Sequence, residues 1–224
     1  MKIHDVEQRS LEWYALRLGK PTASEFGKLV TSKGELSKSL DGYALTLAAE
    51  LYAGEPVDAW EGNAWTERGR ELEDKALTFY AFMQDKELQR VGFVTGDDGR
   101  YGCSPDALVE TDGLAEVKCL KAENHVKAIL YHQKHGRCPP DYVQQAQGQM
   151  MICERAWCDT IFYHPILPLL VVRQESIPDV WIGLRTALEM VMRHRDHALA
   201  ALRRQAGEPT RAATPRELTP LDAG

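Results

Sequence analysis

The sequence predicts an α/β fold in which a mixed central β-sheet is flanked by helices. Residues up to 84 show mainly helical periodicity of apolar positions. Short alternating segments separated by Asp-Gly turns then fill residues 88–120, a pattern typical of a β-meander. Helical segments and two further strands alternate from 122 to 204. Elements in this order favour one sheet whose faces are covered by helices.

Four helices are expected before the meander. Glycines end the first and the third of them, at Gly19 and Gly54. The second begins at a capping box formed by Thr22 and Glu25. In the fourth, Glu73 lies near the edge of an apolar stripe formed by Leu72, Ala76, Phe79, Tyr80 and Met83. These helices are expected at 10–18, 22–30, 39–53 and 65–83.

The remaining elements follow from turn signals and periodicity. Turns at 97–99 and 111–113 separate three expected strands, at 88–95, 100–110 and 114–120. After them we expect helices at 122–132 and 141–154, strands at 158–164 and 169–175, and a helix at 178–204. Residues 1–204 are expected to form a single domain. Residues 205–224, rich in Ala, Pro, Thr and Arg, are expected to form a flexible tail.

Composition and charge exclude several classes of protein. No apolar run reaches the roughly 18 residues that a membrane span needs, and the N-terminus lacks the apolar stretch of a signal peptide, so a cytoplasmic location is expected. Five cysteines, with no CxxC pair, argue against a disulfide framework or a structural zinc site and favour buried thiols. A net charge of −6 weighs against non-specific DNA binding, unless divalent cations cover an acidic site.

The main chemical signal is Asp106, followed after nine residues by Glu116, Val117 and Lys118. Successive side chains on a strand point to opposite faces, so Glu116 and Lys118 share one face and Val117 faces the core. The turn at 111–113 can bring Asp106 beside Glu116. Two carboxylates and the Val117 carbonyl are oxygen ligands that suit Mg²⁺, and Mn²⁺ accepts the same ligands.

A cation bound there would lower the pKa of a bound water and stabilise the charge that builds on a phosphate. Lys118 has three possible roles: orienting that water, deprotonating it, or holding the phosphate. Deprotonation requires a depressed lysine pKa, which a neighbouring metal can produce. The simpler alternative is that Asp106 and Glu116 are solvated and that Glu116 and Lys118 form an exposed pair. The otherwise apolar strand favours the metal site.

Four blocks of sequence together carry a resemblance to a known family. They are residues 16–19 with 22–24, residues 69–73, residues 103–106 with 116–118, and residues 142–147. In their order and spacing, the chain resembles the phage lambda exonuclease-like and YqaJ-type viral recombinase nucleases of the PD-(D/E)xK superfamily. The resemblance implies the restriction-endonuclease-like core of that superfamily, which agrees with the fold class expected from the pattern of elements.

The resemblance also implies roles for the metal-site residues. Asp106 and Glu116 correspond to the metal ligands, with Val117 supplying its carbonyl. Lys118 corresponds to the catalytic lysine, and Glu73 to an additional acidic residue that supports a metal or its water. For Glu73, a solvated helix face is the alternative, because acidic residues flank it on both sides.

Three further residues are matched by position. Gln145 corresponds to a glutamine that positions the nucleophile, although it lies in a run with Gln144, Gln147 and Gln149, so the choice rests on the motif. Arg17 and Ser24 correspond to residues that hold a 5′-terminal phosphate. A helix N-terminus near Ser24 would supply backbone N–H groups to that phosphate, and Arg17 bidentate donors. As alternatives, Arg17 pairs with a surface acid and Ser24 is an ordinary first-turn residue.

The function implied is a magnesium-dependent 5′-to-3′ exonuclease that degrades one strand of linear double-stranded DNA and leaves 3′ single-stranded tails for phage-type recombination. Its expected partners are duplex DNA with a 5′-phosphate end, two further copies of the chain in a ring-shaped homotrimer, and a phage single-strand annealing protein. The alternatives are a PD-(D/E)xK endonuclease of another specificity and a noncatalytic DNA-binding module. The strand-separating wedge of the family has no clear counterpart near residues 60–67.

Overall fold

The computed structural model describes residues 1–57 and 64–207, with residues 64–71 described as backbone only. Most of the expected tail, from residue 208 onward, therefore lies outside the described residues, as does part of the stretch 60–67, where the family wedge has no clear counterpart. The helices are α1 (Leu11–Arg17), η1 (Ala23–Lys28), α2 (Leu40–Ala53), α3 (Ala64–Gln84), α4 (Ala122–His135), η2 (Pro140–Tyr142), α5 (Val143–Cys153) and α6 (Pro178–Gln205). The strands are β1 (Lys2–His4), β2 (Leu88–Gln89), β3 (Phe93–Thr95), β4 (Gly102–Cys103), β5 (Ala107–Val109), β6 (Gly113–Cys119), β7 (Trp157–Tyr163) and β8 (Leu170–Glu175).

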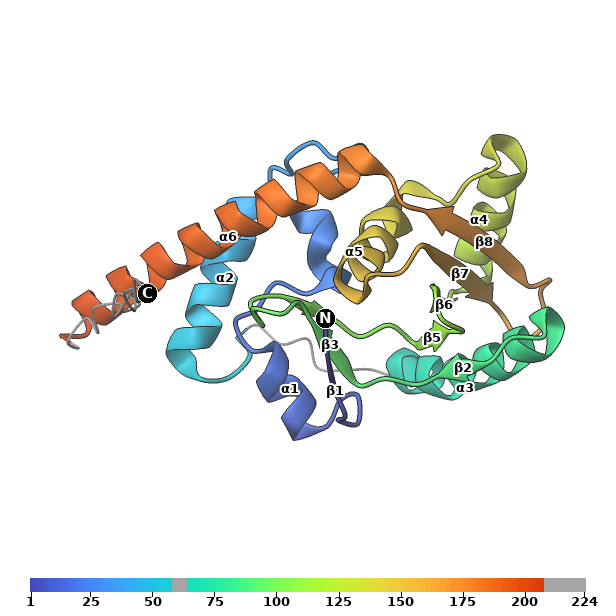
Figure 1. The fold of residues 1–224 in the computed structure, drawn as a ribbon, viewed down its shortest axis with the longest axis horizontal. Coiled ribbons are helices and arrows are strands. Elements are labelled where there is room, and N and C mark those ends of the chain that lie inside the picture. The colour runs from blue at the N-terminus through green and yellow to red at the C-terminus, as the bar shows by residue number, and fades with distance from the viewer. Residues whose placement is uncertain (58–63, 208–224) are drawn as a thin grey trace, which may run out of the picture.

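The larger sheet has five strands in the order β2-β5-β6-β7-β8. Strands β6 and β7 pair in parallel, and the other neighbours pair antiparallel. A parallel pair needs a long crossover connection, which α4 and α5 provide between β6 and β7. The mixed sheet flanked by helices that the sequence predicts is therefore confirmed (Figure 1).

The expected three-strand meander is wrong in one respect. The segment 88–95 forms β2 and β3, and the segment 100–110 forms β4 and β5. Both segments break, because β2 and β5 belong to the five-stranded sheet, whereas β3 and β4 belong to a second sheet with β1. At the two breaks the Gln8 side chain donates hydrogen bonds to the carbonyls of Val91 and Pro105. Pro105 has no N–H to continue a ladder. Asp106 therefore stands at a break, immediately before β5.

The helix that follows Thr22 also differs from expectation. It is the six-residue 3₁₀ helix η1, and Thr22 makes no side-chain capping bond. Thr22 Oγ1 instead accepts a hydrogen bond from Arg17, and the expected capping box does not form. The helix α1 forms as expected, with the Ser10 hydroxyl accepting from the Trp13 N–H at its N-cap.

Helices cover both faces of the larger sheet. On one face, Ala76, Leu77 and Tyr80 of α3 pack with Val117 and Ile161 of the central strands. Phe79 and Met83 are exposed, so the apolar stripe of α3 is narrower than the sequence predicts. The other face is covered by α5. None of the helices in the described ranges has the combination of length and apolar composition that crossing a bilayer requires.

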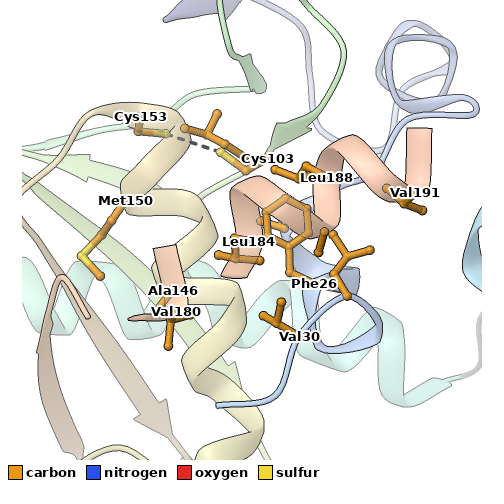
Figure 2. Packing of buried hydrophobic residues seen from close by; sticks show 14 of the residues in the cluster. Phe26, Val30, Cys103, Ala146, Met150, Cys153, Val180, Leu184, Leu188 and Val191 are labelled. Atoms are coloured by element: carbon orange, nitrogen blue, oxygen red, sulfur yellow. Dashed lines mark hydrogen bonds between the residues drawn. The ribbon is translucent and has the colours of Figure 1, made fainter. Parts of the chain in front are cut away.

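The main core lies around α5, against which η1 and α6 pack, while α6 runs beside α2 (Figure 1). Figure 2 shows Phe26 of η1 beside Leu184 and Leu188 of α6. All five cysteines are free, and all but Cys119 are buried, as expected.

Gly148 allows α5 to lie close to η1. A Cβ added to Gly148 would lie 2.3 Å from Cδ2 of the fully buried Phe26. Because the ring cannot move freely in a packed core, we expect Gly148→Ala to lower the free energy of unfolding by about 1–3 kcal/mol, measured by chemical denaturation. Gly42→Ala in α2 is the matched control, since its Cβ would meet no atom within 4 Å. It should be neutral or stabilising, and an equal loss in both variants would contradict the packing argument.

Candidate active site

A cavity of about 190 Å³ brings all the residues singled out in the sequence to one place. It lies on the face of β6 that meets α5, and residues of α1, η1, α3 and the break before β5 also line it. The sequence-predicted residues that line it are Arg17, Ser24, Glu73, Asp106, Glu116, Val117, Lys118 and Gln145. Residues not predicted also line it: Gln8, Arg9, Trp13, Ser104 and Gln149.

Asp106 lies at the acidic centre of this cavity. Its Oδ2 accepts a hydrogen bond of 2.6 Å from the Val117 backbone N–H, which fixes the carboxylate beside β6. Burial raises the pKa of Asp106 well above its usual value, and the negative charges of Glu116 and Glu73 raise it further, while the Val117 hydrogen bond opposes the shift. An ionised Asp106 is therefore unfavourable in the metal-free cavity, because it is buried and lies near two other carboxylates.

Glu116 is held by three donors. Its Oε1 accepts from Gln145 Nε2 at 2.6 Å and from Lys118 Nζ at 2.8 Å, and its Oε2 accepts from Gln149 Nε2 at 2.7 Å. Only 6% of Glu116 is exposed. Each carboxylate oxygen has two lone pairs, so these bonds orient the group and still leave it able to bind a cation.

Lys118 lies on the same face of β6 as Glu116, as the strand alternation predicts, and Val117 packs into the core on the opposite face. Burial alone would lower the pKa of Lys118, but the charge and hydrogen bond of Glu116 and the charge of Asp106 outweigh it and raise that pKa. A raised pKa in the metal-free protein favours a protonated lysine. Of the three roles open to Lys118, holding a phosphate and orienting a water fit this state better than deprotonation.

The donor set fits a hard divalent cation that keeps several waters. Across the described ranges, no group of three or more His, Cys, Asp or Glu side chains is arranged to hold a metal ion. A cation in the cavity would depend on Asp106, Glu116 and the Val117 carbonyl, with water completing the shell, as Mg²⁺ commonly does. The raised pKa of Asp106 supports this fit, since a divalent cation would balance the neighbouring carboxylates.

Glu73 reaches the cavity from α3, but its carboxylate is already paired. Arg9 Nη2 contacts both of its oxygens, at 3.1 and 3.2 Å. Arg9 has a backbone φ of 73°, a conformation that costs energy for a residue with a Cβ. The structure therefore places Glu73 beside the acidic pair, and Arg9 ties it to the start of α1.

Arg17 and Ser24 lie together in the same cavity. Arg17 Nη2 donates to Thr22 Oγ1 at 3.1 Å and to Ser24 Oγ at 3.3 Å, and its guanidinium stacks 4.1 Å from the centre of the Trp13 ring. Burial lowers the pKa of Arg17, so an anion beside it would stabilise the charged form. The helix beside them is the six-residue 3₁₀ helix η1 rather than the longer helix expected, and the side chains of Arg17 and Ser24 are donors that line the cavity.

Some of the cavity residues that were not predicted had a signal in the sequence, and others had none. Ser104, whose Oγ accepts from Trp13 Nε1 at 2.8 Å, lies inside a block that carries the resemblance. Gln149 belongs to the glutamine run of α5 and, four residues after Gln145, lies on the same face of that helix. Arg9 and Gln8 gave no signal, since their contacts join residues 64 to 97 positions apart.

Comparisons with known proteins agree with this site. Residues 12–156 match the model of the YqaJ-like viral recombinase domain. The structure is similar to an alkaline exonuclease from Laribacter hongkongensis, with 30% identity, 88% of this chain and 98% of that chain covered, and a TM-score of 0.77; the same values hold for that enzyme in complex with dAMP. It also shares its fold with a phage-related exonuclease from Haemophilus somnus 129PT (16% identity, 82% and 96% covered, TM-score 0.64).

The comparison with curated protein sequences gave no match. The family match nevertheless spans the break at Asp106, the strand β6 and the glutamines of α5, which are the elements that build the cavity. The chain belongs to the family of YqaJ-like viral recombinase domains.

Proposed function

We propose that this chain is a magnesium-dependent 5′-to-3′ exonuclease that degrades one strand of linear double-stranded DNA and leaves 3′ single-stranded tails for phage-type recombination. The observation that carries the proposal is the shared cavity: the acidic pair Asp106 and Glu116 and the cationic pocket of Arg17 and Ser24 line the same space. A cation site and a phosphate pocket this close together suit the removal of a terminal nucleotide.

The residues have distinct roles in this proposal. Asp106, Glu116 and the Val117 carbonyl would hold Mg²⁺, and Mn²⁺ could take its place. When bound, the metal supplies an activated water and neutralises charge on the scissile phosphate. Protonated Lys118 would donate to that phosphate or orient the water, and Gln145, which contacts both Lys118 and Glu116, would keep their positions fixed.

The phosphate pocket is the basis for proposing digestion in the 5′-to-3′ direction. Arg17 and the hydroxyl of Ser24 can both donate to a terminal phosphate, and an arginine can do so with two parallel bonds. The proposal requires that, with a 5′-phosphate held there, the next phosphodiester in the strand reaches the acidic pair in the same cavity. An endonuclease on the same scaffold has no need for such an end pocket, so the pocket favours the exonuclease over that alternative.

The similar proteins support exonuclease chemistry. One is an alkaline exonuclease, also solved with dAMP, and another is a phage-related exonuclease. Deoxynucleoside monophosphates such as dAMP are the products expected when an exonuclease removes single nucleotides. From the family resemblance we also propose a homotrimeric ring around the DNA and a phage single-strand annealing protein as partner. Charge lining such a ring, rather than the net charge of −6, would decide DNA binding.

The proposal is tested with two DNA substrates of identical sequence. One is a linear duplex with a 5′ phosphate at one end only, and the other is a covalently closed circle. With Mg²⁺ we expect single nucleotides to be released from the phosphorylated strand and the circle to survive, and with a chelator in place of Mg²⁺ we expect neither substrate to be degraded. Cleavage of the circle would instead support the endonuclease, and digestion that starts at the 3′ end would refute the polarity.

A further inference from the structure

Gln149 on α5 contacts the acidic centre from the interior of the protein. It lies one helical turn after Gln145, on the same face, and only 1% of it is exposed. The two amides divide Glu116 between them: Gln145 Nε2 donates to Oε1 and Gln149 Nε2 donates to Oε2. With both oxygens held, the carboxylate plane of Glu116 is fixed relative to Asp106.

The other end of the Gln149 amide has no partner. In the described part of the chain, Gln149 Oε1 is one of three buried side-chain atoms without a hydrogen bond, and the other two belong to His125 and Trp181, which do not line the cavity. Buried polar atoms are nearly always paired, because an unpaired acceptor has lost its contact with water and received nothing in return. An unpaired acceptor at the edge of a polar cavity therefore points to a donor that binds there.

Gln147 on the same helix shows what a purely structural glutamine looks like here. It is fully buried, its Nε2 donates to the Glu175 carbonyl at 2.8 Å, and its Oε1 accepts from the Ile177 N–H at 2.8 Å. Its amide thus joins α5 to the last residue of β8 and to the segment that leads into α6. Within the described fold, both the nitrogen and the oxygen of the Gln147 amide have hydrogen-bond partners, whereas only the nitrogen of the Gln149 amide has one.

We infer that Gln149 is a positioning residue of the metal site: its Nε2 holds Glu116 for the cation, and its Oε1 accepts a hydrogen bond from a water in the shell of that cation. A water bound to a cation is a strong donor, and Mg²⁺ keeps several such waters when it binds through few carboxylates. This inference rests on the proposed function, because it requires a cation between Asp106 and Glu116. It predicts that Gln149 contributes to metal binding and little to the fold.

The test compares Gln149→Met with Gln147→Met, because methionine has nearly the same volume as glutamine and no amide. Mg²⁺ affinity is measured by titration calorimetry without DNA, and the melting temperature is measured without metal. For Gln149→Met we expect Mg²⁺ affinity to fall about 10- to 100-fold, as for other residues that hold metal ligands, and the melting temperature to fall less than in Gln147→Met, because one amide hydrogen bond is lost instead of two. For Gln147→Met we expect the melting temperature to fall by about 4 °C or more and Mg²⁺ affinity to stay within about twofold of wild type.

Three results separate the possibilities. Wild-type Mg²⁺ affinity in Gln149→Met would overturn the inference and leave the proposed function intact, whereas a wild-type protein that binds no Mg²⁺ would refute the proposed function itself. A fall in melting temperature as large as that of Gln147→Met, in both Gln149→Met and the shorter Gln149→Leu, would assign Gln149 to the fold and also overturn the inference.

Discussion

Asp106→Asn is expected to abolish DNA digestion while making the metal-free protein more stable. Asparagine keeps an oxygen that can accept the Val117 N–H but removes the negative charge that a cation would bind. A loss of about 4 kcal/mol of transition-state stabilisation corresponds to about a thousandfold in rate, so we expect at least that decrease. Rates of nucleotide release from a linear duplex measure it, and a rate within tenfold of wild type would remove Asp106 from the metal site.

The expected gain in stability follows from the sign of the pKa shift. Burial and the charges of Glu116 and Glu73 raise the pKa of Asp106 in the folded state, so its ionised form is less favourable there than in the unfolded chain. The ionised carboxylate therefore destabilises the fold at neutral pH, and this destabilisation fades as the pH falls through the folded-state pKa. Replacing it by a neutral amide should raise the melting temperature at pH 7 without metal.

A matched control for this result is Asp159→Asn. Asp159 is also buried, but it accepts hydrogen bonds from Tyr80 and from two nitrogens of Arg173, so its charge is balanced within the fold. Its replacement should lower the melting temperature and leave the stabilisation by Mg²⁺ unchanged. Asp106→Asn should show the opposite pattern, because a cation that binds the folded state stabilises it by mass action only where its ligands remain.

The contrast between these two aspartates shows which part of the site could be predicted from the sequence and which could not. Glu116, Val117 and Lys118 were predictable because a strand has a period of two, and two charges on one face of an apolar strand need a reason. The hairpin turn gave the proximity of Asp106. Such arguments use local geometry alone. They cannot show that the charge of Asp159 is balanced by Arg173, whereas, among the residues that the structure describes, the Asp106 carboxylate accepts only from a backbone N–H.

Contacts between distant segments explain what the sequence did not predict. The split of the meander depends on Gln8, whose amide reaches two carbonyls more than eighty residues away. Arg9 reaches Glu73 through a backbone conformation that no local pattern favours for arginine. Thr22 has the spacing of a capping residue, yet its hydroxyl accepts from Arg17. In each case a long-range or side-chain partner displaced the local preference.

Arg17→Ala is the second change with a large expected effect, and it tests how the enzyme recognises its DNA end. We expect the ratio of digestion rates for 5′-phosphorylated and 5′-hydroxyl ends to fall by about 10- to 100-fold, because hydrogen bonds to a charged group contribute about 1.5–3 kcal/mol each. Arg17→Lys should give an intermediate ratio, since lysine keeps the charge but not the paired donors. The ratio is measured on one duplex prepared with either end.

The matched control is Arg185→Ala on α6. Like Arg17, Arg185 lies over a tryptophan ring, at 5.8 Å from the centre of Trp181, but it is exposed and does not line the cavity. Its loss should leave the end preference unchanged. Because Arg17 also stacks on Trp13, part of any rate loss could come from a displaced ring rather than from the phosphate. Only the phosphate contact changes the ratio between the two ends, so an unchanged ratio in Arg17→Ala would exclude Arg17 from end recognition even if the rates fall.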